Sequence, residues 1–182
     1  MKLDTFDKCA FERGAGKFTE VAWIILQVFF FSSALPGSGW RTWILRLFGA
    51  KIGKHVMIKP RARVKFPWRL EIGEFSWIGE AVWIDNLLET RIGSHCCISQ
   101  SAYLCTGNHD WSKNSFDFSG QPIEIHDQVW LGAKVVVGPG VKIGEGAVLC
   151  VGSVATKDLL PWTINAGNPA TRVAERKELN SV

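Results

Sequence analysis

The chain of 182 residues is 47% hydrophobic and 21% charged, a balance that indicates one globular domain with a short extra segment and excludes a disordered chain. The formal net charge of +4 comes from scattered Lys and Arg residues, which argues against a nucleic-acid-binding protein and suits an anionic small ligand. The five cysteines are odd in number and follow no apparent secretory signal, so we expect a cytoplasmic protein.

The first 51 residues are predicted to form an apolar helical segment. Val21–Phe31 is almost wholly apolar, and apolar residues resume over Trp40–Phe48 after a break that contains Pro and Gly. Neither run reaches the roughly 20 residues that span a bilayer. Two interpretations stay open. The segment is a packed cap or subunit contact, or residues 21–48 make a peripheral contact with the inner face of a membrane, where Trp and Arg side chains suit the headgroup region.

Large apolar residues recur at a spacing of six, in sets of three, from Ile52 onward. Six residues make one short strand and a corner, and three such units make a triangular coil whose neighbours stack about 4.8 Å apart. The pattern therefore predicts an all-β solenoid over residues 52–160, a parallel β-helix of about five coils that begin at residues 52, 72, 92, 125 and 143. The anchors are Ile52, Ile58 and Val64; Ile72, Ile78 and Ile84; Ile92, Ile98 and Leu104; Ile125, Leu131 and Val137; and Ile143, Leu149 and Ala155.

Two further positions of the repeat are restricted in size. A Gly follows the anchor at residues 53, 73, 79, 93, 132, 138 and 144, where it would allow either a positive φ or a close backbone approach at a tight corner. A small or β-branched residue, such as Val56, Ala62 or Ser76, comes four residues after most anchors. Such a side chain fits beneath the anchor in a narrow core.

Every departure from the spacing falls after the third anchor of a coil. The extra residues lie near Phe66–Leu70, near Asn86–Arg91 and over Gly107–Gln121, so all three should emerge at one corner of the triangle. Insertions gathered on one side of a repeat protein indicate its binding side. A loop as long as 107–121 in a compact fold is expected to be functional.

His109 stands at the head of this longest insertion. Asp85 and Asn86 follow the equivalent anchor one coil earlier, so we expect the three side chains to lie close together. A histidine beside polar groups is a good general-base candidate near neutral pH, although a lone histidine can also be structural. The four histidines lack the paired spacing of zinc ligands and the chain has no CxxC pair, so no metal site is expected.

Five longer stretches carry a family resemblance. They are WRTWILRLFGAKIG from Trp40, IDN from Ile84, CISQSAYLCTGNHD from Cys97, VWLGAKVVVGPGVKIGEGAVLCVGSVATKD from Val129, and INAGNPATRV from Ile164. In these stretches the chain resembles the hexapeptide-repeat sugar O-acetyltransferases, in particular those of colanic acid and exopolysaccharide biosynthesis. The resemblance implies a left-handed coil and a homotrimer with active sites between subunits. It also implies acetyl-CoA as the donor of an acetyl group to a hydroxyl of a sugar or glycan intermediate, in exopolysaccharide- or capsule-type glycan biosynthesis.

The same resemblance implies roles for individual residues. His109 matches the catalytic histidine of the family, and Asp85 and Asn86 match a polar position on the acceptor side. Thr171 is an addition to the family pattern after the AGNPA turn, so Arg176 stays an alternative to Arg172 as the residue that meets the CoA phosphate. The donor-side matches are Ala133 and Val151, which would offer backbone to the pantetheine arm, Thr156 and Lys157, which would meet the cofactor, and Arg172.

Two other functions stay open from the sequence. An amino-sugar N-acetyltransferase would use a similar site, because an amine can replace the hydroxyl as the nucleophile. A non-catalytic β-helix scaffold for trimerisation would need neither a loop histidine nor a CoA-type tail, and this chain has both. Residues 161–182 are expected to form a short C-terminal tail.

Overall fold

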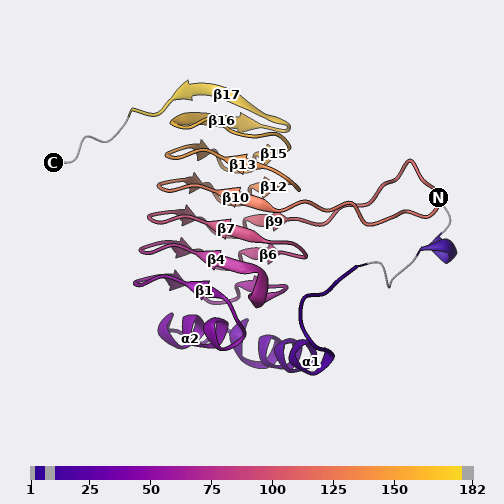
Figure 1. The fold of residues 1–182 in the computed structure, drawn as a ribbon. Helices are drawn as coiled ribbons and strands as arrows, with labels where there is room; N and C mark the ends of the chain where they lie inside the picture. Colours follow the sequence, from indigo (N-terminus) through magenta and orange to yellow (C-terminus); the bar gives the residue numbers. More distant parts are fainter. Residues whose placement is uncertain (1–2, 7–10, 178–182) are drawn as a thin grey trace.

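The computed structural model describes residues 3–6 and 11–177 of the chain. Its body is a triangular parallel β-helix, with coils stacked from β1 at the base to β17 at the opposite end (Figure 1). Three sheets form the sides of the triangle. Sheet A contains β1 (Lys51–Ile52), β4 (Leu70–Ile72), β7 (Thr90–Ile92), β10 (Ile123–Ile125) and β13 (Lys142–Ile143). Sheet B contains β2 (Met57–Ile58), β5 (Trp77–Ile78), β8 (Cys97–Ile98), β11 (Trp130–Leu131), β14 (Val148–Leu149), β16 (Thr163–Gly167) and β17 (Ala170–Glu175). Sheet C contains β3 (Arg63–Val64), β6 (Trp83–Asp85), β9 (Tyr103–Cys105), β12 (Val136–Val137) and β15 (Val154–Ala155).

The strand register confirms the predicted starting points of the coils. Ile52 pairs with Ile72, Ile72 with Ile92, and so on through Ile125 to Ile143. Five coils are complete, and an incomplete sixth follows, so the structure has about six coils rather than five. The sixth begins at Leu159, which bridges to Ile143, and continues in β16, which pairs with β14. The spacing concealed it because Leu159 comes two residues earlier than the eighteen-residue interval between Ile125 and Ile143 predicts.

The described part of the predicted C-terminal tail, residues 161–177, contains β16 and β17 at the end of sheet B. β17 folds back antiparallel onto β16 and covers the last edge of sheet B. Because an open strand edge presents unpaired backbone groups, this return protects the end of the stack.

The core consists of the anchors and of the small residues that the repeat predicts beneath them. Apart from the partly buried Ile52 of the first coil, both sets are buried along the length of the β-helix, which confirms the narrow core. Of the two reasons expected for the glycines that follow the anchors, a positive φ and a close backbone approach, only the close approach applies. A Cβ added at Gly73 would lie 2.5 Å from the Ser94 nitrogen of the next coil, so close backbone approach requires Gly there. The positive φ of these corners falls two residues later, at residues such as Phe75 and His95.

Helices close the base of the stack beneath β1 (Figure 1). They are α1 (Lys17–Leu26), the π-helical η3 (Gln27–Phe31) and α2 (Gly39–Leu47), while η1 (Leu3–Thr5) and η4 (Pro67–Arg69) are short 3-10 turns. Side chains of this segment bond to backbone groups at the open edge of the first coil. The Trp23 indole donates to the Val64 oxygen at 3.0 Å, and the Gln27 side-chain oxygen accepts from the Val64 nitrogen at 2.7 Å. The Ser38 hydroxyl donates to the Ile58 oxygen and accepts from the Ile58 nitrogen, and the Arg46 guanidinium donates to the Ile52 oxygen. Each of the three sheets therefore has its first strand capped by this segment.

Buried Arg41 holds the connection between η3 and α2. Its guanidinium donates to the backbone oxygens of Phe31, Ser33, Leu35 and Gly37, and its burial lowers its pKa from the ordinary value. Within the described residues, no helix is long and apolar enough to cross a membrane.

Candidate functional site

The three insertions emerge at the corner between sheets C and A, as predicted, and the longest forms an arm. Residues 106–121 leave the coil as two antiparallel segments that project from the side of the stack (Figure 1). Gln121 donates to the Thr106 oxygen at 2.9 Å, and Ser119 donates to the Asn108 oxygen at 2.9 Å. At the tip, two hydrogen bonds from Ser112 hold the pKa of the Asp110 carboxyl below its usual range. The arm is therefore a hydrogen-bonded hairpin and not an irregular loop.

His109 lies on this arm with its imidazole fixed on one edge. Its Nδ1 lies 2.8 Å from the Phe116 oxygen, and its ring stacks on the Phe116 ring with centroids 4.3 Å apart and an interplanar angle of 3°. The Phe6 ring meets the imidazole edge-on at 5.4 Å. A carbonyl oxygen can only accept, so this contact selects the tautomer with hydrogen on Nδ1. Nε2 then carries the lone pair that a general base needs.

Asp85 lies one coil below the arm, opposite Cys105 in the register. Its Oδ2 accepts a hydrogen bond from the Tyr103 hydroxyl at 2.9 Å. Burial, and then the neighbouring Cys105 and Asp85, raise the pKa of Tyr103 well above its usual range. The phenol therefore stays protonated at neutral pH and keeps orienting the carboxylate. Thr106, at the root of the arm, bonds through its hydroxyl to the Asp85 backbone oxygen at 3.2 Å.

Asn86 has a different environment from the one expected. Its side chain is fully buried; its Oδ1 accepts from the Phe66 nitrogen at 3.0 Å and its Nδ2 donates to the oxygens of Phe66 at 2.7 Å and Arg69 at 3.1 Å. All of these partners belong to the first insertion. The amide therefore ties two insertions together, and Asp85 is the member of the pair with a side chain available to a ligand.

The donor-side residues occupy two neighbouring corners near the upper end of the stack. Ala133 and Val151 lie at the corner between sheets B and C on consecutive coils, where the Gly152 nitrogen donates to the Ala133 oxygen at 2.9 Å. Val151 is 71% exposed. Thr156 and Lys157 follow β15 and are exposed. In the part of the chain that the structure describes, Lys157 has no ion-pair partner, so its ammonium is available to an anion.

The two candidate arginines differ in what they contact. Arg172 is exposed on β17, where its guanidinium pairs with the Glu175 carboxylate. Arg176 donates to the backbone oxygens of Gln128 at 2.9 Å and Gly146 at 3.0 Å, and its guanidinium lies 5.8 Å from the centroid of the Trp162 ring. Arg176 therefore joins β17 to the corners of the coils below, which leaves Arg172 as the better candidate for a phosphate contact.

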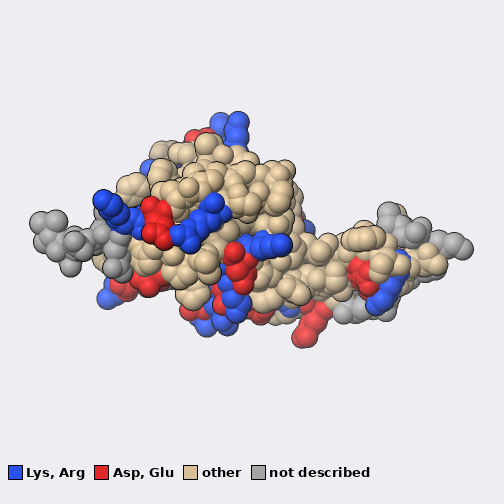
Figure 2. Space-filling model, turned by 90° about the horizontal axis from the view of Figure 1, so that it is seen from above, with Lys and Arg blue, Asp and Glu red and all other residues tan. Residues whose placement is uncertain are grey.

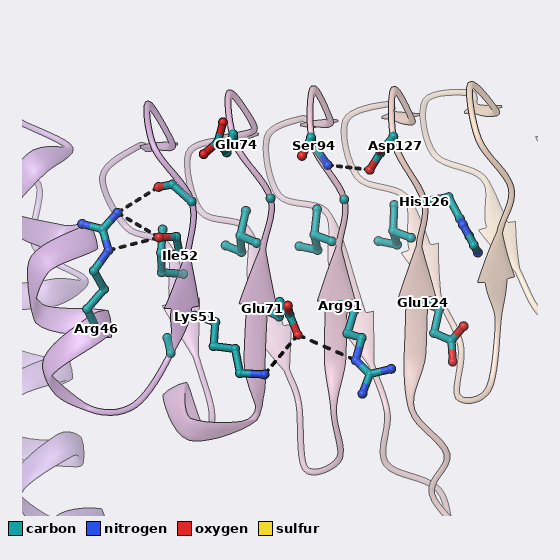
Figure 3. Close-up of a pocket in the computed structure, with 17 residues that line it drawn as sticks. Arg46, Lys51, Ile52, Glu71, Glu74, Arg91, Ser94, Glu124, His126 and Asp127 are labelled. Carbon is teal, nitrogen blue, oxygen red and sulfur yellow. Dashed lines mark hydrogen bonds and ion pairs between the residues drawn. The ribbon is translucent and has the colours of Figure 1, made fainter.

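A hollow of about 730 Å³ lies elsewhere, along the outer face of sheet A (Figure 3). Lys51, Glu71, Arg91 and Glu124 alternate in sign along it, and Glu71 pairs with Lys51 at 3.7 Å and with Arg91 at 3.8 Å. These charges largely neutralise one another. The hollow contains none of the predicted site residues, and we place the candidate site at the arm, where the free imidazole nitrogen and an oriented carboxylate share one corner.

Tyr103 and Phe116 are the neighbours of the predicted residues that sequence reasoning missed. Tyr103 was detectable, because the register places it at an outward position of β9, two residues before Cys105, which lies opposite Asp85 of β6. Phe116 contributes its backbone oxygen and its ring from the far side of the arm, and no spacing in the sequence indicates that contact.

The comparisons with known proteins agree with this fold. The family model for bacterial transferase hexapeptide (six repeats) matches residues 122–157. WcaF of Escherichia coli (strain K12), which is named as a colanic acid biosynthesis acetyltransferase, is 45% identical over 139 residues, or 76% of each chain. A maltose O-acetyltransferase from Clostridium difficile 630 superposes with a TM-score of 0.79 at 26% identity over 90% of each chain.

A third comparison concerns the fold alone. The hexapeptide-repeat acetyltransferase VCA0836 from Vibrio cholerae O1 biovar eltor, solved in complex with acetyl coenzyme A, superposes with a TM-score of 0.83 at 24% identity, over 92% of this chain and 93% of that one. Superposition of this quality requires the same sense of coiling, which agrees with the left-handed coil expected from the sequence. The identity to WcaF over three quarters of both chains shows that this chain belongs to the hexapeptide-repeat acetyltransferases and is an acyltransferase.

Proposed function

We propose that this acetyltransferase moves the acetyl group of acetyl-CoA to a sugar hydroxyl in exopolysaccharide- or capsule-type glycan biosynthesis, with His109 as the general base. The observation that carries the proposal is the imidazole on the projecting arm, held at Nδ1 by the Phe116 oxygen at 2.8 Å. The colanic acid role in the name of WcaF and the acetyl coenzyme A in the Vibrio cholerae structure support the acceptor and donor classes.

His109 would move a single proton twice. Its Nε2 accepts the proton of the acceptor hydroxyl as that oxygen attacks the thioester carbonyl carbon. The positive charge that develops on the imidazole is stabilised by the Phe116 oxygen on Nδ1. When the carbon–sulfur bond breaks, Nε2 returns the proton to the departing thiolate, so the products are an acetyl ester and a free thiol. General acid–base catalysis of this kind typically contributes 10²–10⁴-fold.

Asp85 is our proposed contact for the acceptor. Because Tyr103 occupies Oδ2 of the carboxylate at 2.9 Å, Oδ1 is the atom that can accept from a second sugar hydroxyl. Such a contact would orient the ring that presents its reacting hydroxyl to His109. Asn86, fully buried and bonded to Phe66 and Arg69, would act only by holding this corner in shape.

The donor would lie along the exposed corners above the arm. We propose that Ala133 and Val151 offer backbone groups to the pantetheine arm and that Thr156, Lys157 and Arg172 meet the rest of the molecule. The unpaired Lys157 ammonium and the exposed Arg172 guanidinium suit phosphate groups. Arg172 would have to exchange its contact with Glu175 for the phosphate.

We also propose a homotrimer with the site between subunits, in the cytoplasm. The arm projects away from its own coils (Figure 1), so a neighbouring subunit could receive it. The outer face of sheet B supports such packing, because Trp77 and Trp130 there are 52% and 51% exposed. The free thiols of Cys96, Cys97, Cys105 and Cys150 suit a reducing compartment.

The first test is His109→Ala, measured by release of free thiol from acetyl-CoA in a screen of sugar acceptors. We expect turnover to fall by at least about two orders of magnitude while binding of acetyl-CoA, followed by thermal shift, is retained. The matched control is His95→Ala, because His95 is exposed at a different corner, where it stacks on Phe75, and its loss should leave turnover unchanged. Full turnover in His109→Ala would refute the assignment of the base.

The acceptor screen separates the alternatives. Transfer to amino sugars alone, with an amide as the mapped product, would replace the proposal by N-acetylation. An absence of any stabilisation by millimolar acetyl-CoA would support a non-catalytic scaffold, because a ligand that binds only the native state must raise its stability.

A further inference from the structure

The helical base of the stack carries an apolar surface that the fold does not use. α1, η3 and α2 already bury Trp23, Phe31, Ile44 and Leu45 against the first coil. These helices and the connection between η3 and α2 also expose ten large apolar side chains, each at least half accessible. These are Phe18, Val21, Ile24, Ile25, Val28, Phe29, Phe30, Leu35, Trp43 and Leu47. A monomeric soluble protein seldom exposes so many large apolar side chains in one short segment, which indicates an interaction surface.

A hollow in this surface is wholly apolar in its lining. It has a volume of about 510 Å³ and lies between η3 and α2, where Phe30, Trp40 and Trp43 contribute to its walls. Hydrocarbon suits such a lining, whereas a polar ligand would find no partner in it. The two tryptophans have the amphipathic rings that favour the boundary between headgroups and acyl chains.

The charge around this base is mostly positive, with Glu20 of α1 paired to Arg13. Residues 21–70 contain nine Lys and Arg and no Asp or Glu, whereas the rest of the chain contains twelve Lys and Arg and seventeen Asp and Glu. Seen from the opposite end of the stack, basic and acidic side chains are interspersed (Figure 2). The concentration of positive charge is therefore a property of the base and not of the whole molecule.

Three lysines distribute this charge around the first coil. Lys54, Lys59 and Lys65 stand at its three corners, one between each pair of sheets, and all are exposed. Within the described ranges none of the three has a carboxylate partner, unlike Lys51 and Arg61, which pair with Glu71 and Glu80. The apolar helices are thus surrounded by a ring of unpaired ammonium groups one layer above them.

We propose that the base of this β-helix docks on an anionic lipid bilayer. The helices lie flat across the bottom of the stack (Figure 1), so they can enter the interface side by side with their exposed faces down. The three corner lysines then reach anionic headgroups, and each basic residue near such a surface adds about 1 kcal/mol of attraction. Anionic lipid matches both halves of the surface, because it offers hydrocarbon to the helices and negative charge to the lysines.

The test is flotation of the full-length protein with vesicles. With about 30 mol% phosphatidylglycerol in phosphatidylcholine at about 0.1 M salt, where charge attraction still operates, we expect the protein to float with the lipid. With phosphatidylcholine alone the bound fraction should fall sharply. Lys54→Glu/Lys59→Glu/Lys65→Glu should weaken binding to the anionic vesicles by roughly 100-fold or more. Lys134→Glu/Lys142→Glu/Lys177→Glu, with the same change in net charge, should weaken it far less.

The apolar half of the surface has its own variants. Phe29→Asp/Trp43→Asp replaces two side chains that are 70% and 61% exposed, so the fold should survive and vesicle binding should be lost. Trp111→Asp, at an 80% exposed position on the arm, is the control that should bind like the parent chain. A parent chain that stays unbound with anionic vesicles would refute the proposal. So would a Phe29→Asp/Trp43→Asp variant that still floats but changes its mass in light scattering, because the patch would then be a contact between protein chains.

Discussion

Replacement of Asn86 by Ala should destabilise the protein, because its amide satisfies backbone groups that water cannot reach. The Phe66 nitrogen is buried with its residue and has the Asn86 side chain as its partner at 3.0 Å. The Phe66 oxygen keeps a bond from the Arg69 nitrogen, so it loses less. A buried group left unpaired costs about 1–3 kcal/mol, and the space left by the missing amide adds to that. We expect the free energy of unfolding to fall by about 2–4 kcal/mol.

Asn86→Asp sharpens the same prediction through its pH dependence. The amide nitrogen donates to oxygens at 2.7 Å and 3.1 Å, and a carboxylate there would face both of them with a second acceptor. Its protonated form can donate, so its pKa should be raised in the folded state. The loss of stability relative to the parent should therefore be largest near pH 7 and shrink as the pH falls toward about 4.

The assay is urea unfolding followed by tryptophan fluorescence at pH 5 and 7.5. Gln100→Ala is the control, because that side chain is exposed at another corner and should change the free energy of unfolding by less than about 0.5 kcal/mol. An Asn86→Ala variant as stable as the control, or an Asn86→Asp variant whose deficit is independent of pH, would show that the amide does not hold the corner.

Two further predictions concern the core. Gly73→Ala should cost about 1–3 kcal/mol, because its Cβ would lie 2.5 Å from the Ser94 nitrogen, whereas Gly39→Ala, with nothing within 4 Å, should be neutral or slightly stabilising in thermal unfolding. Burial raises the pKa of the Cys96 thiol from 9.0 to about 11. The stability that this raised pKa contributes to the folded state is therefore fully present below pH 9 and is lost as the pH rises through 11. Between those values the parent chain should lose about 2 kcal/mol more unfolding free energy than Cys96→Ala in denaturant titrations, and an equal loss in both would contradict the burial of a neutral thiol.

The coils were predictable because a six-residue period constrains every turn in the same way. One anchor such as Ile72 must stack on Ile92, since any shift would move the whole row of side chains out of the core. The helical base was predictable only as an apolar segment. Which of its side chains cap the coil depends on where α1 and α2 cross it, so the roles of Trp23 and Arg46 as partners of backbone oxygens could not be read from the spacing.

At the candidate site, the strand register determines whether a side chain points inward or outward for two residues beyond the third anchor of each coil. In each coil with an insertion, the alternation of inward and outward side chains continues past the third anchor. Ile84 points inward, Asp85 outward and Asn86 inward, and the equivalent inward positions of the coils below and above are Phe66 and Thr106.

The same alternation of inward and outward side chains holds where the chain re-enters the next coil after each insertion. Leu70, Thr90 and Ile123, two residues before the next anchors, are buried as well. The corner that bears the insertions is therefore wider than the other two and is filled by one extra inward residue on each side. This alternation explains why Asp85 lies at the surface and Asn86 in the interior. After Thr106 the chain leaves the coil, so the alternation of inward and outward side chains ends there. The orientation of His109 is set instead by a hydrogen bond across the arm to the Phe116 oxygen, a contact that forms only when the arm folds.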